Sequence, residues 1–191
     1  MAALVGSTRI VLTGPECSGK TTLAAALAEH FGAPWVPEAA RRFVETSPGA
    51  LSAETVEPIA RLSMRLEDEL LVGAPPLLVR DTDLVSTVVY AHHYYGHCPA
   101  WVEREALARR ADLYLLGRPD LPWTPDGVRD RPTQREALFT AFARKLTAIE
   151  ARVVELHGEG EARTLLAVRA VTALLDERRG GAKSGGADRP R

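Results

Sequence analysis

The sequence predicts an α/β fold in which helices cover both faces of a five-stranded parallel sheet. Two observations lead to this prediction. Short runs rich in leucine and β-branched residues alternate with longer segments of helical period, which is the pattern of repeated βαβ units. The segment 14–21, GPECSGKT, directly follows the first such run and matches the phosphate-binding pattern GxxxxGK[ST]. We therefore expect the three-layer αβα sandwich of P-loop NTPases, of the nucleoside and nucleotide kinase type.

The elements follow from the spacing of apolar residues. We expect helices at 20–31, over a stripe from Val56 to Leu70, and from a capping box at 133–136 through an apolar stripe that ends at Leu156. The strands are expected at 9–13, near 34–36, and at 76–81, 112–116 and 163–168.

Length and composition indicate one domain that handles small molecules. The 191 residues suffice for one α/β domain, which we place at 1–179, and the glycine-rich segment 180–191 is expected to be a disordered tail. With 24 basic and 25 acidic residues, no net field attracts nucleic acid or an anionic membrane. Two cysteines, no signal peptide and no long apolar run favour a cytoplasmic protein, whose oligomeric state the sequence leaves open.

The phosphate loop is the clearest functional motif. Gly14 and Gly19 allow the chain to wrap so that backbone N–H groups cradle nucleotide phosphates at a helix N-terminus. Lys20 is expected to reach the β- and γ-phosphates of ATP, and Thr21 to offer its hydroxyl to Mg²⁺. The residues expected to form the ATP cradle are Gly14, Pro15, Glu16, Cys17, Ser18, Gly19, Lys20, Thr21 and Thr22.

Carboxylates follow two of the predicted strands, where the site of an open parallel sheet is expected. Glu38 follows the second strand and is our first candidate for the base that accepts a proton from a hydroxyl, with Arg41 beside it. An equally good interpretation of Glu38 is a helix-start residue that serves the helix dipole. Asp81 ends the third strand, where P-loop proteins hold Mg²⁺, and Asp83 is the reserve candidate for the base. The alternative for both aspartates is a solvated turn.

The segment of about 117–135 is expected to be a lid. Proline and glycine punctuate it, and it carries several arginines, including Arg129 and Arg135. A closing segment of this kind brings positive charge to the transferred phosphoryl group and excludes water. The alternative is a polar loop held by exposed Asp–Arg pairs, each of which contributes less than about 1 kcal/mol.

Several motifs together resemble the ribosylnicotinamide kinase domain of bacterial NadR proteins. They are GPECSGKTT at 14–22, Glu38 with Arg41, DTD at 81–83, YG at 95–96, and DLPWTPDGVR at 120–129 followed by Arg135. The resemblance covers about residues 8–175 and implies transfer of the γ-phosphoryl group of ATP to the 5′-hydroxyl of nicotinamide riboside. It implies ATP and Mg²⁺ as cofactors.

Two other functions remain open at this stage. The acceptor could be another nucleoside or nucleotide, or the chain could be a non-enzymatic ATP- or GTP-binding switch. An arginine-rich lid and a base-like Glu38 are superfluous for a switch. If the acceptor is a cationic pyridinium nucleoside, an aromatic side chain could stack on it. The candidates for that contact are Trp35, Tyr90, Tyr94 and Trp123.

Overall fold

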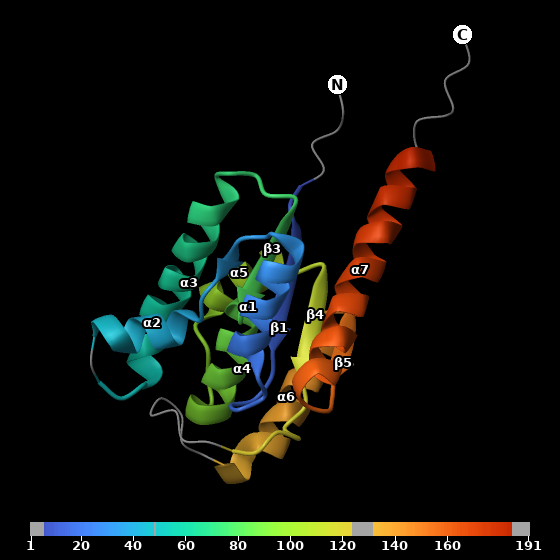
Figure 1. Ribbon diagram of the computed structural model, residues 1–191. Helices are drawn as coiled ribbons and strands as arrows, with labels where there is room; N and C mark the ends of the chain where they lie inside the picture. The colour runs from blue at the N-terminus through green and yellow to red at the C-terminus, as the bar shows by residue number, and fades with distance from the viewer. Residues whose placement is uncertain (1–5, 48, 124–131, 185–191) are drawn as a thin grey trace.

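The computed structural model describes residues 6–47, 49–123 and 132–184, of which 132 and 181–184 are described by their backbone alone. It contains a five-stranded sheet flanked by helices (Figure 1). The strands are β1 (Thr8–Thr13), β2 (Trp35–Val36), β3 (Leu77–Asp81), β4 (Leu113–Gly117) and β5 (Val153–Leu156). The helices are α1 (Lys20–Phe31), α2 (Ala39–Thr46), α3 (Val56–Leu71), α4 (Leu84–Tyr95), α5 (Ala100–Ala108), α6 (Arg135–Ala148) and α7 (Gly160–Ser184), with 3₁₀ turns at Ala53–Thr55 and Pro132–Gln134.

All strand pairs of the sheet are parallel, in the order β2-β3-β1-β4-β5. The central strand β1 pairs on one side with β3, Ile10 opposite Val79, and on the other with β4, Ile10 opposite Leu113. The predicted α/β fold with a five-stranded parallel sheet is confirmed. Because the strands run the same way, their carboxyl ends meet at one edge, where the loops after β1, β2, β3 and β4 come together.

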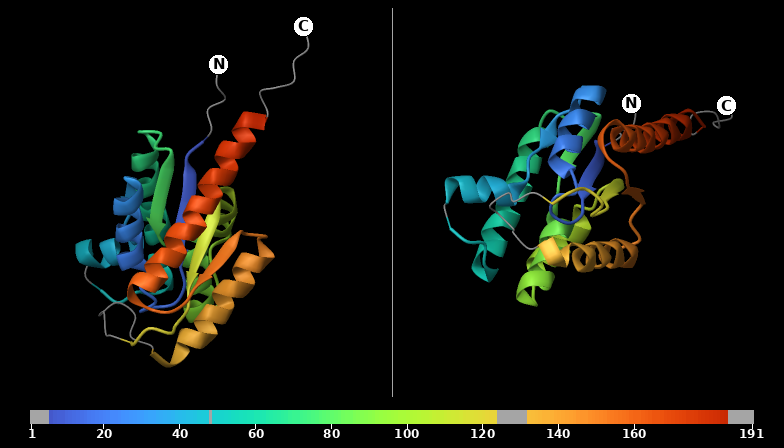
Figure 2. Two further views of the ribbon diagram at one scale, coloured as in Figure 1. Left: turned by 45° about the vertical axis from the view of Figure 1, so that its right-hand side comes forward. Right: turned by 60° about the horizontal axis from the view of Figure 1, so that its bottom comes forward.

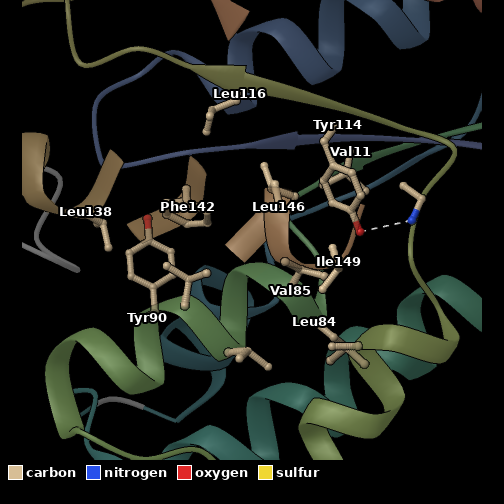
Figure 3. Packing of buried hydrophobic residues seen from close by; sticks show 14 of the residues in the cluster. Val11, Leu84, Val85, Tyr90, Tyr114, Leu116, Leu138, Phe142, Leu146 and Ile149 are labelled. Carbon is tan, nitrogen blue, oxygen red and sulfur yellow. Dashed lines mark hydrogen bonds between the residues drawn. The ribbon is translucent and has the colours of Figure 1, made fainter. Parts of the chain in front are cut away.

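Side-chain alternation along β1 divides the core into two layers. Ile10 and Leu12 belong to the cluster formed with α1 and α7. Val11 belongs to the cluster on the opposite face, formed with α4, α5 and α6. The two layers of helices are visible in Figure 2, and part of the second cluster, with Val11 and Phe142, in Figure 3. Each of these large apolar side chains stabilises the fold by about 1.5–3 kcal/mol when fully buried.

Two predictions about the C-terminal part of the chain are wrong: a fifth strand at 163–168, and a helix that continues to Leu156. The strand β5 is Val153–Leu156, and 163–168 lies in α7. Helix α6 ends at Ala148, and Glu150 adopts a left-handed backbone (φ 51°) that turns the chain into β5. The apolar residues of the strand happen to continue the helical spacing, and a short apolar run fits either element.

The predicted start of one helix and the predicted start of the tail also differ from the structure. Helix α6 begins at Arg135, after the 3₁₀ turn, and its N-cap residue is Gln134 without a side-chain cap, so no capping box forms at 133–136. Helix α7 extends to Ser184, past the expected start of the tail at Gly180. The remainder of the predicted tail, 185–191, lies outside the described residues.

Candidate functional site

The phosphate loop, residues 14–19, joins β1 to α1 and packs against the end of β4. Gly14 has φ +127°, and a Cβ atom there would lie 2.7 Å from the carbonyl oxygen of Gly117. A Cβ atom on Gly117 would in turn lie 2.9 Å from Ser18 Oγ. Both positions therefore need glycine because two backbone segments approach each other closely. Cys17 also has a left-handed backbone, with φ 53°.

Side chains donate hydrogen bonds to the carbonyl groups of this loop. Ser18 Oγ and Lys20 Nζ donate to the carbonyl of Pro15 at 2.8 and 2.7 Å. Arg135 Nε donates to the carbonyl of Glu16 at 3.2 Å, and its Nη2 donates to that of Cys17 at 3.1 Å. When the carbonyl groups of a turn are committed in this way, its N–H groups are left for an anion, as in a phosphate-binding nest.

In this structure the Arg135 guanidinium donates to carbonyl groups of the phosphate loop and of the expected lid. Its third hydrogen bond runs from Nη1 to the carbonyl of Leu121 at 3.0 Å, and the residue is only 9% exposed. The guanidinium thus joins the phosphate loop to the first residues of the expected lid. Its contact with ATP stays a prediction, as does that of Arg129, which lies outside the described residues.

Asp81 meets the start of α1. Thr21 Oγ1 donates to Asp81 Oδ2 at 2.6 Å, while Asp81 Oδ1 is buried without a hydrogen-bond partner in the described part of the chain. Burial, and next the charge of Glu38, raise the pKa of Asp81 to about 6, against the opposing effects of Lys20 and Thr21. A hydroxyl beside a carboxylate with an unused buried oxygen fits Mg²⁺, which prefers oxygen ligands. Thr22, the next residue of the motif, is exposed.

Glu38 occupies the N-cap position of α2, directly after β2. It is 9% exposed, and its Oε2 atom lies 3.9 Å from Arg41 Nε, so the predicted pairing with Arg41 forms. Strand β2 pairs with β3, Val36 opposite Arg80, so Glu38 and Asp81 lie at the ends of neighbouring strands, and the charge of Glu38 contributes to the raised pKa of Asp81. Two neighbouring buried carboxylates favour a cationic group between or beside them.

Asp83 points into the core. It is the N-cap residue of α4 and accepts hydrogen bonds from the backbone N–H of Ser86 at 3.0 Å and the Tyr114 hydroxyl at 2.9 Å. Burial raises the pKa of its carboxyl group, and the charge of Arg80 opposes that effect. The same Tyr114 hydroxyl accepts from the backbone N–H of Ala111 (Figure 3). These contacts give Asp83 a structural role, as the cap of α4 and the acceptor for the Tyr114 hydroxyl.

A cavity of about 330 Å³ lies between α2, α3 and α4, next to these carboxylates. Glu38 lines it, together with apolar side chains of α2 and α3 and a tyrosine-rich face of α4. Of the four aromatic candidates, Tyr90 and Tyr94 line the cavity, whereas Trp35 and Trp123 are not among its lining residues. The rings of Tyr90 and Tyr94 stack with their centroids 5.9 Å apart. The cavity has the size of a small-ligand site.

Two residues of the motifs named above take positions that the sequence analysis did not specify. Tyr95 of the YG motif lines the cavity, as does Ser63. Asp120 does not face the phosphate loop but accepts hydrogen bonds from Arg163 Nη1 at 2.7 Å and from the backbone N–H of Gly158 at 2.8 Å. It therefore fixes the start of the expected lid to the loop between β5 and α7.

Comparison with known proteins gives both sequence and structural relatives. A family model described as an AAA domain matches residues 9–163. The trifunctional NAD biosynthesis/regulator protein NadR of Escherichia coli K12 is 27% identical over 177 residues, which cover 89% of this chain and 43% of the relative. NadR of Salmonella typhimurium LT2 is 30% identical over 124 residues, 63% of this chain and 30% of the relative. The chain spans less than half the length of these curated relatives.

Solved structures share the fold. A NadR protein crystallised in complex with NR has a TM-score of 0.71 at 24% identity, over 87% of this chain and 50% of that one. A NadR protein in complex with NAD and AMP-PNP has a TM-score of 0.70 at 23% identity, over 87% of this chain and 49% of that one. Thymidylate kinase from Ehrlichia chaffeensis has a TM-score of 0.62 at 13% identity, over 88% of this chain and 99% of that one.

Proposed function

The chain belongs to the AAA domain family, and from this premise and the geometry of its site we propose that it is an ATP-dependent kinase of a small nucleoside. The observation that carries the proposal is the position of Glu38. Glu38 lines the cavity and follows the strand beside the one that ends in Asp81, which contacts Thr21 at the phosphate loop. A phosphoryl acceptor in the cavity and ATP on the loop would therefore meet at this carboxylate.

We infer nicotinamide riboside as the acceptor, phosphorylated at its 5′-hydroxyl to nicotinamide mononucleotide. The stacked rings of Tyr90 and Tyr94 offer π-faces, and Glu38 offers negative charge, to a cationic pyridinium ring. The relatives named above support this choice, since they are NAD biosynthesis proteins and a NadR protein binds NR in a crystal. Only part of each relative is represented in this chain, so their other activities are not carried over.

The reaction is an in-line displacement in which the protein mainly positions the reactants. Lys20 leaves the Pro15 carbonyl, its partner in this structure, to contact the β- and γ-phosphates. Glu38 accepts the proton of the acceptor hydroxyl as that oxygen forms its bond to the γ-phosphorus and the bond to the leaving ADP oxygen breaks. Thr21 and Asp81 would hold Mg²⁺, which neutralises phosphate charge when bound. Arg129 and Arg135 remain proposed phosphate contacts of the lid.

The proposal is tested by an acceptor screen with γ-labelled ATP, followed by two variants. We expect nicotinamide riboside to be the best acceptor, with thymidine, uridine and adenosine as comparisons. Glu38→Gln should lower kcat by about 10²–10⁴ and leave ATP affinity nearly unchanged, because a general base acts in the transition state. Lys20→Ala should lower kcat more than about tenfold, since it removes charge stabilisation from a dry site.

Matched controls of the same residue types are available. Glu45→Gln changes an exposed glutamate of α2, and Lys145→Ala changes a lysine of α6 away from the loop; neither should alter kcat. Turnover of another nucleoside and not of nicotinamide riboside would overturn the acceptor and leave the kinase. ATP binding without any phosphorylated acceptor would instead favour the nucleotide-binding switch.

A further inference from the structure

The cavity and the phosphate loop are joined by tyrosine side chains of one helix. Tyr94, on α4, lines the cavity, and its hydroxyl donates to Glu16 Oε1 of the phosphate loop at 2.6 Å. One turn earlier, Tyr90 also lines the cavity, and its hydroxyl donates to the carbonyl of Gly14 at 3.1 Å. Each tyrosine thus lines the cavity and reaches the phosphate loop with its hydroxyl group.

We propose that Tyr94 is a positioning residue that couples the two sites: its hydrogen bond to Glu16 holds the phosphate loop in its ATP-binding form, and an acceptor packed on its ring strengthens that hold. The part of this inference that concerns the acceptor rests on the proposed function. The part that concerns the loop does not, because it needs only the Tyr94–Glu16 bond.

Charge explains why the side chain of Glu16 must be held. Glu16 is 6% exposed and belongs to a loop that has to receive anionic phosphates. A buried carboxylate needs hydrogen-bond donors, and a carboxylate that turned toward the phosphates would repel them. The hydroxyl of Tyr94 supplies a donor on the side of the loop that faces α4. Hydrogen bonds to charged groups are the stronger ones in proteins.

The backbone of Glu16 is fixed from another direction. Arg135 donates to the carbonyl of Glu16 and, at its other end, to the carbonyl of Leu121. The loop is therefore held by its side chain from α4 and by its main chain from α6. Since the ring of Tyr94 stacks on that of Tyr90 and forms part of the cavity wall, an acceptor that packs there restricts the motion of both hydroxyl groups. Coupling of this kind is reciprocal between the two ligands.

The first experiment is a double-mutant cycle on the affinity for AMP-PNP, measured by calorimetry without any acceptor. Tyr94→Phe keeps the ring and removes the donor, and we expect it to weaken AMP-PNP binding about tenfold. The same change made in a Glu16→Ala background should have no further effect, because the bond is already absent. In a Glu16→Gln background Tyr94→Phe should still weaken binding several-fold, since the amide oxygen accepts the same hydrogen bond.

The second experiment measures the coupling. In the wild type, saturating nicotinamide riboside should tighten AMP-PNP binding about three- to tenfold, and Tyr94→Phe should reduce that factor to near one. Glu29→Gln, an exposed carboxylate at the far end of α1, is the matched control and should change neither quantity. Melting temperatures of all variants separate a local effect on the loop from a general loss of stability.

The outcomes separate this inference from the proposed function. Additive effects of Tyr94→Phe and Glu16→Ala, or unchanged AMP-PNP affinity in Tyr94→Phe, would overturn the positioning role even if nicotinamide riboside is phosphorylated normally. Unchanged coupling in Tyr94→Phe would overturn the connection between the sites. A non-additive cycle together with no binding of nicotinamide riboside would support the link to the loop and overturn the acceptor.

Discussion

At the scale of single residues, two aspartates separated by one residue have different surroundings. Asp81 faces Thr21 and the phosphate loop and keeps one buried oxygen without a partner in the described residues. Asp83 caps α4 and accepts a hydrogen bond from the Tyr114 hydroxyl in the core. The segment 81–83 therefore combines a residue suited to the metal with a residue that fixes the helix carrying Tyr90 and Tyr94.

The different surroundings give a prediction for Asp83. Asp83→Ala should lower the free energy of unfolding by about 2 kcal/mol, because it removes a helix cap and leaves the buried Tyr114 hydroxyl without its acceptor. Asp83→Asn keeps an acceptor oxygen and should cost less than about 1 kcal/mol and keep kcat within about threefold. Urea unfolding and steady-state kinetics measure both. A folded Asp83→Asn variant without activity would return the base role to Asp83.

At the scale of elements, two buried arginines hold the described residues at the two ends of the expected lid. Arg163, 2% exposed, donates to Asp120 and to the carbonyls of Arg118, Leu156 and Gly158. Arg135 fixes the other end to the phosphate loop. Residues 118–121 and Arg135 are therefore held at defined points beside the phosphate loop, and closure of the segment that joins them stays a prediction.

Adding one methyl group to the phosphate loop tests its contact with the end of β4. Gly14→Ala should weaken AMP-PNP binding more than tenfold, because the new Cβ would lie 2.7 Å from the Gly117 carbonyl oxygen at a backbone angle of φ +127°. Gly73→Ala is the control, since the nearest atom to its Cβ is a carbonyl oxygen at 3.7 Å and its φ is not positive. Equal affinities for the two variants would show that the loop tolerates displacement from β4.

At the scale of the whole molecule, a buried ion cluster joins the sheet to two helices. Glu67 of α3 and Arg80 of β3 are both fully buried and pair at 2.8 Å. Arg9 of β1 and Arg109, which follows α5, also contact Glu67, at 3.4 and 3.3 Å. Arg80 Nε and Nη2 have no hydrogen-bond partner among the described residues. A buried charge of this kind depends strongly on its counter-charge.

Removing the counter-charge should therefore be more costly than removing the pair. Glu67→Gln should lower the free energy of unfolding by about 3–5 kcal/mol, because the charge of Arg80 stays buried. Glu67→Gln with Arg80→Met should cost clearly less than the sum of the single changes. Glu45→Gln, which breaks an exposed pair with Arg42, should cost less than about 1 kcal/mol in the same urea titrations. Additive losses would show that Glu67 and Arg80 stabilise the fold independently.

The sequence by itself determined the features that depend on local pattern. The GxxxxGK[ST] spacing identified the phosphate loop, and short runs of leucine and β-branched residues located β1, β3 and β4 to within about a residue. The carboxylates after β2 and β3 followed, because the ends of parallel strands meet at one edge. The position of β5 was not predictable in this way, since residues 153–156 continue the apolar spacing of α6 and only their pairing with β4 makes them a strand.

Tertiary structure alone decided which groups meet. Asp81 and Asp83 carry the same side chain, and only their packing shows that one faces the loop and the other the core. The hydrogen bonds from Tyr94 to Glu16 and from Arg135 to the carbonyls of Glu16 and Cys17 join residues at least 78 positions apart along the chain. Contacts at such separations leave no periodic signal in a sequence, because they arise from how whole helices pack on the sheet.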